Sequence, residues 1–155
     1  MKGDPKVIET LNALLARELT VVSQYMVHAE MCDNWGYSIL HEAIQKRAVV
    51  EMKHAEELIG RIIFLEGIPV VNELQKMNIG ADVSNMFSND HEAELDAVQQ
   101  YNSGILVCGE AKDYATREIL EHILNDEDSH VDSIEEVQDQ IAQMGIQVFL
   151  STQVK

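Results

Sequence analysis

The sequence predicts an all-α fold: a four-helix bundle with one long crossover connection and a short fifth helix at the C-terminus. Two observations lead to this prediction. Apolar residues recur at helical spacing over four long stretches, and residue types recur after 76 positions, as Tyr25 and Tyr101 do (101 minus 25). The chain therefore reads as two related helical hairpins that form a single domain over residues 1–155.

Helix boundaries follow from capping residues. Asp4 and Pro5 predict a helix start, because Asp accepts hydrogen bonds from free amides and Pro suits the first turn. Gly67 predicts the end of the second helix, and Asp113 caps the fourth. Residues 67–81 are long enough to cross the bundle from end to end, which is the ferritin-like arrangement. The expected helices span residues 4–34, 37–66, 82–110, 113–144 and 146–152.

Composition limits the class of protein. The 155 residues are 46% apolar, with 27 acidic against 11 basic side chains, a balance that argues against nucleic acid as a partner. No apolar run resembles a signal peptide or approaches the ~20 residues of a membrane span, so we expect a soluble, cytoplasmic protein. Cys32 and Cys108 are too few for a disulfide scaffold and are expected to be buried free thiols.

Six ionisable residues form a pattern of three residues that occurs twice in the chain. Two Glu-x-x-His units lie 76 positions apart (127 minus 51), and a single glutamate precedes each unit by 33 (51 minus 18; 127 minus 94). The set is Glu18, Glu51, His54, Glu94, Glu127 and His130. All lie on inward apolar stripes, where an unpaired carboxylate costs several kcal/mol. A salt bridge could explain any one of them, but six in matched register predict a metal centre.

The ligand types indicate which metals the centre would take. Glu51 and Glu127 are expected to bridge two ions held ~3.5 to 4 Å apart. Terminal ligands come in two pairs, Glu18 with His54 and Glu94 with His130. Oxygen and nitrogen donors without thiolate suit iron or manganese, with zinc as a competitor. Two irons could share the electrons needed to reduce dioxygen or peroxide. Tyr25 could donate a hydrogen bond to a carboxylate of the site or supply an electron. Alternatively, it is a core tyrosine whose hydroxyl is hydrogen-bonded and has no functional role.

Several segments match one known family along essentially the whole chain. They are the opening Met-Lys-Gly-Asp, Gln24-Tyr25, Asn34-Trp35-Gly36, Glu51-Met52-Lys53-His54-Ala55, residues 61–69 (RIIFLEGIP) and Asn78-Ile79-Gly80. With these segments the chain resembles a bacterioferritin. The resemblance implies a hollow shell of twenty-four identical subunits that oxidises Fe(II) with dioxygen or hydrogen peroxide and stores a ferric mineral. It also implies that the six residues above are the ferroxidase ligands.

Met52 gains a role from the same resemblance. A second, mostly apolar stripe faces away from the predicted core and consists of Leu19, Val22, Ser23, Met26, Val49, Met52, Ala55 and Ile59. Such a stripe suggests a partner surface. The family binds haem b between two subunits through a methionine from each, so Met52 is expected to be the axial ligand. A bacterioferritin-associated ferredoxin would then supply electrons through the haem for iron release.

Some positions depart from the family. Lys46 and Val50 replace a histidine and an acidic residue that several members use for iron on the inner surface. Arg47 stands where an acidic residue is usual and lies four positions before Glu51, so an ion pair between these two is expected. Ser133 replaces a common tryptophan. Asn34, Glu66 and Asp132 match residues that line pores between subunits in the family, and Glu136 makes that route more acidic than usual, which would favour iron entry.

Other functions remain open at this point. A haem-free ferritin would share the di-iron chemistry and is distinguished by Met52 on its apolar stripe. A di-iron peroxidase of the rubrerythrin kind is a further alternative, although its Cys-x-x-Cys pairs are missing. A non-enzymatic haem-binding or structural cage would use the polar core residues only to fix the bundle register.

Overall fold

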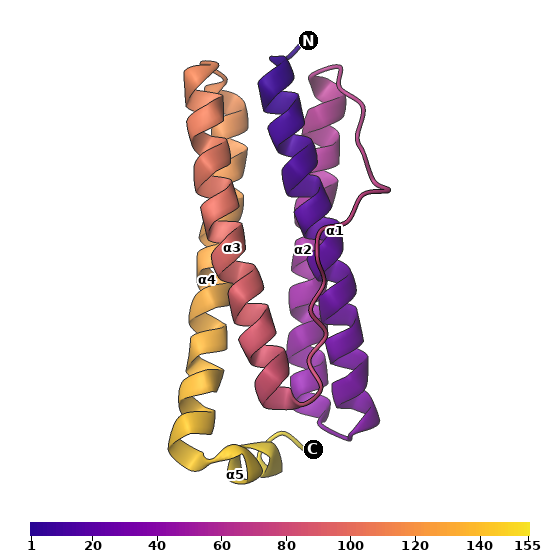
Figure 1. Cartoon of the computed structure of the whole chain (residues 1–155), viewed down its shortest axis with the longest axis vertical. Helices are drawn as coiled ribbons and strands as arrows, with labels where there is room; N and C mark the ends of the chain where they lie inside the picture. Colours follow the sequence, from indigo (N-terminus) through magenta and orange to yellow (C-terminus); the bar gives the residue numbers. More distant parts are fainter.

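The computed structural model describes all 155 residues and confirms the all-α prediction. Its helices are α1 (Pro5–Asn34), α2 (Ser38–Phe64), α3 (Val83–Glu110), α4 (Tyr114–Met144) and α5 (Ile146–Ser151). The α1–α2 hairpin packs beside the α3–α4 hairpin, and the short α5 lies across the lower end of the bundle (Figure 1). None of the helices combines the length and the apolar character that a bilayer crossing requires.

Aspartates cap three of the long helices, and two of them, Asp4 and Asp113, were predicted to do so. The side chains of Asp4, Asp82 and Asp113 each accept a hydrogen bond from a backbone amide two or three residues further on. The second helix ends two residues earlier than expected, at Phe64. It ends there because Glu66 adopts a left-handed conformation (φ 62°), which turns the chain before Gly67 is reached.

The crossover between α2 and α3 lies along α1, and polar side chains of α1 hold it there (Figure 1). Backbone amides of the crossover donate hydrogen bonds to Asn12, Thr20, Gln24 and His28, in chain order. These four positions are separated by multiples of four, so they share one face of α1. At the end of the crossover only glycine fits, because a Cβ on Gly80 would lie 2.5 Å from the backbone nitrogen of Met86.

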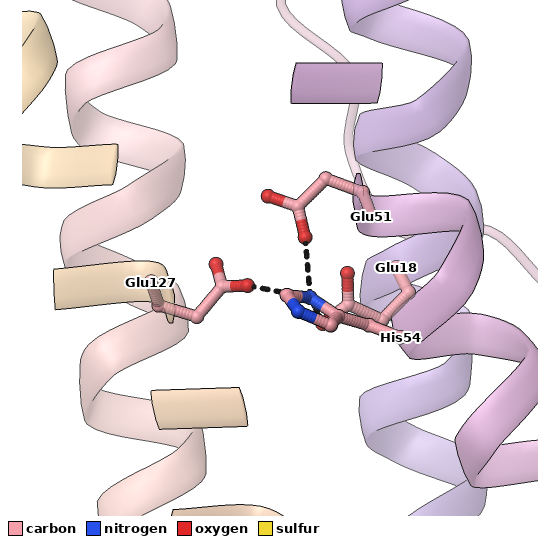
Figure 2. Close-up of side chains that lie close together, drawn as sticks. All are labelled: Glu18, Glu51, His54 and Glu127. Atoms are coloured by element: carbon pink, nitrogen blue, oxygen red, sulfur yellow. Dashed lines mark hydrogen bonds and ion pairs between the residues drawn. The ribbon is translucent and has the colours of Figure 1, made fainter. Parts of the chain in front are cut away.

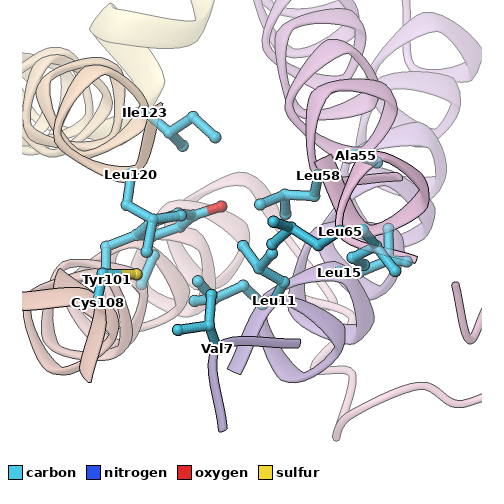
Figure 3. Packing of buried hydrophobic residues seen from close by; sticks show 13 residues of the cluster. Val7, Leu11, Leu15, Ala55, Leu58, Leu65, Tyr101, Cys108, Leu120 and Ile123 are labelled. Atoms are coloured by element: carbon cyan, nitrogen blue, oxygen red, sulfur yellow. The ribbon is translucent and has the colours of Figure 1, made fainter. Parts of the chain in front are cut away.

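The apolar core consists of two separate clusters. One cluster, shown in Figure 3, is built around Leu11, Leu58 and Leu120, and the other around Ile44, Phe87 and Ile134. The two thiols lie one in each cluster. Both are buried and free, as expected, and burial raises the pKa of each to about 11. Along each long helix the residues between the two clusters are the ionisable ones, so a polar layer separates the two halves of the core.

Candidate metal centre

All four helices of the bundle contribute to the polar layer, and the six predicted residues meet there. The carboxylates come from Glu18, Glu51, Glu94 and Glu127, one per helix, and all are fully buried. His54 projects from α2 and His130 from α4, each three residues after its glutamate. One helical turn therefore places a carboxylate and an imidazole on the same face, as the Glu-x-x-His spacing predicts.

Two groups of side chains in this layer could each hold a metal ion. The first group is Glu18, Glu51, His54 and Glu127, and the second is Glu51, Glu94, Glu127 and His130. Within each group the candidate ligand atoms lie within 4.8 Å of one another. Figure 2 shows the first group, with His54 between Glu51 and Glu127. Glu51 and Glu127 belong to both groups, which is the arrangement expected of two bridging carboxylates.

Both imidazoles present Nδ1 to the carboxylates. His54 Nδ1 lies 3.0 Å from an oxygen of Glu51 and 3.0 Å from one of Glu127. His130 Nδ1 lies 3.0 Å from Glu51 and 3.4 Å from Glu94. Two carboxylates surround each ring nitrogen, so an ion at either position would meet oxygen and nitrogen donors together.

The outer nitrogens of the two histidines differ. His54 Nε2 lies 2.8 Å from a carboxylate oxygen of Asp126, which fixes the orientation of the ring. Asp126 directly precedes Glu127, and the equivalent position before Glu51 is Val50, which cannot accept a hydrogen bond from His130. Sequence reasoning missed Asp126, although its place beside Glu127 and 76 positions after Val50 (126 minus 50) was a usable signal.

Two tyrosines hold the terminal carboxylates from opposite sides. The hydroxyl of Tyr25 on α1 donates a hydrogen bond to Glu94 on α3, and that of Tyr101 on α3 donates to Glu18 on α1. Burial, and then the neighbouring carboxylates, raise the pKa of both phenols well above the usual value, so both remain protonated donors. Tyr101 was not singled out from the sequence, although it is the repeat partner of Tyr25.

Arg17 is the residue of the centre that sequence reasoning missed most completely. Its guanidinium is 2% exposed and touches all four glutamates. Nη1 lies 3.0 Å from Glu127, 3.2 Å from Glu18 and 3.5 Å from Glu51, and Nη2 lies 3.4 Å from Glu94. Burial opposes its charged form, but the four carboxylates outweigh burial and raise the pKa of Arg17 well above the usual value. The guanidinium is therefore a permanent cation within the layer.

Burial and the charge of Arg17 shift the pKa values of the carboxylates in different directions. Burial raises the pKa of Glu51 and of Glu127 well above the usual range. Burial acts the same way on Glu94, but Arg17 and His130 outweigh it and lower its pKa. Burial opposes the charged form of His54, yet hydrogen bonds to Glu127 and Glu51 raise its pKa to about 11. Without metal, the layer therefore holds protons on groups that metal ligation requires to be deprotonated.

The donor set fits a pair of divalent ions. Both carboxylate oxygens of Glu127 are buried, one 3.0 Å from His54 Nδ1 and the other 3.0 Å from Arg17 Nη1, so a metal ion could bind them in place of these positively charged partners. Four carboxylates carry the charge that two divalent ions would neutralise, and no thiolate is among the donors. Carboxylate and imidazole ligands of this kind suit iron or manganese, with zinc as a competitor.

Arg47 does not pair with Glu51, contrary to the expectation from their spacing. Its guanidinium lies 3.7 Å from Asp90 on α3 and 5.4 Å from the centre of the Tyr25 ring. Asp90 is a fully buried carboxylate that also accepts a hydrogen bond from Gln24 and lies 2.9 Å from His28 Nδ1. Arg47 therefore compensates a fifth buried acid, while Arg17 takes the place beside Glu51.

Met52 lies on the outside of α2, away from the metal centre. Its side chain is 43% exposed, and Met26 and Val49 on the same stripe are exposed too. One member of the predicted stripe is misplaced: Ala55 is buried in the core cluster that contains Leu58, because it is only one position from His54 on the inward side of the helix.

Comparison with known proteins agrees with the fold. Residues 8–144 match the family model described as a ferritin-like domain, which defines the class of protein. Curated relatives include a bacterioferritin of Brucella melitensis, 37% identical over 94% of this chain and 90% of the relative. One of Streptomyces coelicolor is 38% identical over 100% and 93%, and one of Rhodobacter capsulatus is 39% identical over 87% and 84%. The chain belongs to the bacterioferritin family, a family of iron-storage proteins.

Replacing Asp126 tests the orientation of His54. We expect Asp126→Ala to weaken binding of one of two Co(II) ions by roughly 10- to 100-fold, since lost support of a ligating histidine costs about that much. Anaerobic titration of metal-free protein, followed by visible absorption, measures both affinities. Val50→Ala is the matched control, because valine makes no hydrogen bond to His130. Equal affinities for wild type and Asp126→Ala would show that Asp126 does not support the ligand.

Metal binding should release protons. His54, Glu51 and Glu127 have raised pKa values in the metal-free centre, so protons bound at neutral pH must leave before these groups ligate. Affinity for Zn(II) should therefore rise with pH between about 6 and 8. Calorimetry in two buffers of different ionisation enthalpy counts the protons released. An observed heat that is independent of the buffer would contradict the expected proton release.

Proposed function

We propose that this protein is a ferroxidase that oxidises Fe(II) at the buried centre and stores the ferric product. The observation that carries the proposal is the pair of ligand groups that share Glu51 and Glu127, each completed by one histidine and one further glutamate. In a chain of the bacterioferritin family this arrangement supports Fe(II) as the substrate. Dioxygen or hydrogen peroxide is the oxidant.

The proposed roles follow from position. Glu51 and Glu127 bridge two irons, Glu18 and His54 complete one, and Glu94 and His130 complete the other. Tyr25 and Tyr101 orient the terminal carboxylates through the hydrogen bonds that they donate. Two irons bound this closely supply two electrons together, which is the number that reduces dioxygen to hydrogen peroxide. The surrounding apolar clusters exclude bulk water from the reacting ions.

Storage requires a shell, and the surface of the subunit supports assembly. We propose a homo-oligomer of twenty-four subunits built from two-fold dimers. Large apolar side chains that are more than half exposed gather at the end of α2 and in the crossover: Ile63, Phe64, Ile68, Val71 and Leu74. Exposure on this scale is typical of a surface that neighbouring subunits cover. The net charge of −16 favours the accumulation of iron cations within such a shell.

Haem b between two subunits is the proposed electron route for iron release. Met52 supports this role because it is exposed on a stripe with other apolar side chains, so a two-fold partner could place two methionines face to face. A bacterioferritin-associated ferredoxin is the proposed electron donor. A haem-free ferritin would share the metal centre, and haem content distinguishes the two functions.

Removing a bridging carboxylate tests the ferroxidase. Glu127→Ala should slow Fe(II) oxidation by at least ~100-fold, since one ligand common to both ions is lost, while the assembled particle still forms. Stopped-flow absorbance after adding about two Fe(II) per subunit anaerobically and then air measures the rate. Asp128→Ala, at the neighbouring exposed position, is the control and should behave as wild type. Wild-type protein that shows no rapid oxidation would refute the proposed function.

Haem ligation is tested at Met52. Purified protein supplied with haem should show bis-methionine absorption, and Met52→Leu should remove it, because leucine preserves the volume but lacks the thioether. Met144→Leu is a matched control, since both methionines are 43% exposed. Full haem retention in Met52→Leu would show that another residue is the ligand.

A further inference from the structure

Arg17 occupies the place where a metal ion would be expected to interact with the carboxylates. Its two terminal nitrogens are within 3.5 Å of an oxygen from each of the four glutamates. The same oxygens belong to the side chains that form the two ligand groups. A guanidinium and a divalent ion therefore compete for one set of negative charges.

The guanidinium of Arg17 is held against the four glutamates by charge more than by hydrogen bonds. Its Nε is buried without a partner, and its hydrogen bonds to Glu18, Glu94 and the carbonyl of Ala93 are 3.2, 3.4 and 3.3 Å long. These lengths exceed the 2.7 to 2.9 Å typical of charge-assisted pairs. A cation held in this way can be replaced by one that offers stronger bonds to the same oxygens.

The structure offers a place for a displaced guanidinium. Arg17 lines a cavity of about 270 Å³ that is formed by residues of α1, α3 and the crossover. No residue of α2 or α4, the helices that carry His54 and His130, lines this cavity. Two exposed acids, Glu92 and Asp96, line the same cavity, and Lys76 is its other cation. The Arg17 side chain could thus leave the carboxylates and still have negative partners.

Charge counting separates two states of the centre. Four carboxylates and Arg17 leave three negative charges for protons or His54 to balance when metal is absent. Two divalent ions neutralise four carboxylates completely, so Arg17 within the layer would then add one unpaired buried positive charge, which is unfavourable in an apolar interior. The guanidinium stabilises the metal-free state and opposes the second ion.

We propose that Arg17 is an exchangeable counter-cation: it holds the metal-free centre together, weakens binding of the second divalent ion, and moves toward Glu92 and Asp96 when that ion enters. This inference rests on the proposed two-metal function. It assigns Arg17 the role of a residue that sets how many ions the centre holds at a given metal concentration.

Anaerobic Co(II) titration of the assembled, metal-free protein tests the competition. Arg17→Gln, which removes the charge, should bind the second ion roughly 10- to 100-fold more tightly than wild type, the range expected for a lost charged hydrogen-bonded pair. Arg17→Lys, which keeps the charge, should remain close to wild type. Arg117→Gln removes an exposed arginine on α4 and is the matched control. Equal affinity of wild type and Arg17→Gln for the second ion would overturn the proposal.

Stability and structure provide readouts that do not depend on the oxidation reaction. Metal-free Arg17→Gln should melt at a lower temperature than wild type, and Zn(II) should raise its melting temperature by more, because zinc replaces the missing cation. If Arg17→Gln does not fold, a zinc-bound structure of the wild-type protein still decides. Arg17 found against the carboxylates with two zinc ions present would overturn the exchange.

The outcomes also separate this inference from the proposed function. If neither wild type nor any Arg17 variant binds two Co(II) ions per subunit, the two-metal centre itself is wrong and both proposals fail. If all variants bind two ions with the same affinity, the ferroxidase proposal stands and the role of Arg17 is refuted.

Discussion

The burial of four carboxylates in one layer of a helical bundle is the constraint on which the rest of this structure depends. Each would cost several kcal/mol without a compensating positive charge or hydrogen bonds. The fold meets this cost with two histidines, the guanidinium of Arg17 and the hydroxyls of Tyr25 and Tyr101. The apolar core is accordingly split into two clusters, one on each side of the layer.

The sequence was sufficient to predict the helices and the six residues that meet in the polar layer, because both depend on local periodicity. A three-residue spacing places Glu51 and His54 on one face in any α-helix. The 76-residue repeat predicts the same arrangement a second time, for Glu127 and His130. The role of Arg17 could not be predicted from the sequence. Its position next to Glu18 does not determine whether its long side chain points into the core or toward solvent. The pairing expected of Arg47 was wrong for a related reason. Helical spacing allowed a contact with Glu51, but α3 brings Asp90 to the same guanidinium.

The crossover shows the same division between local and distant information. Its length and position followed from the helix boundaries, whereas its attachment depends on which face of α1 it meets. Polar side chains are regularly spaced on that face, from Asn12 to His28, because they accept hydrogen bonds from backbone amides of the crossover. The sequence does not show which amides lie opposite them. The crossover thereby covers α1 over the turns that carry Arg17 and Glu18, and it closes one side of the cavity beside the metal centre.

Departures from the internal repeat show where the two halves of the centre differ. The six candidate ligands are duplicated, but Arg17, Arg47 and Met52 of the first hairpin correspond to Ala93, Ile123 and Asp128 of the second, each 76 positions later. In the other direction, Asp126 supports His54 while its counterpart Val50 leaves His130 unsupported and partly exposed. Two ions held by equivalent ligands would therefore experience unequal surroundings. The ion beside His54 has the more rigid ligand, so it should be retained longer, and the ion beside His130 should exchange first.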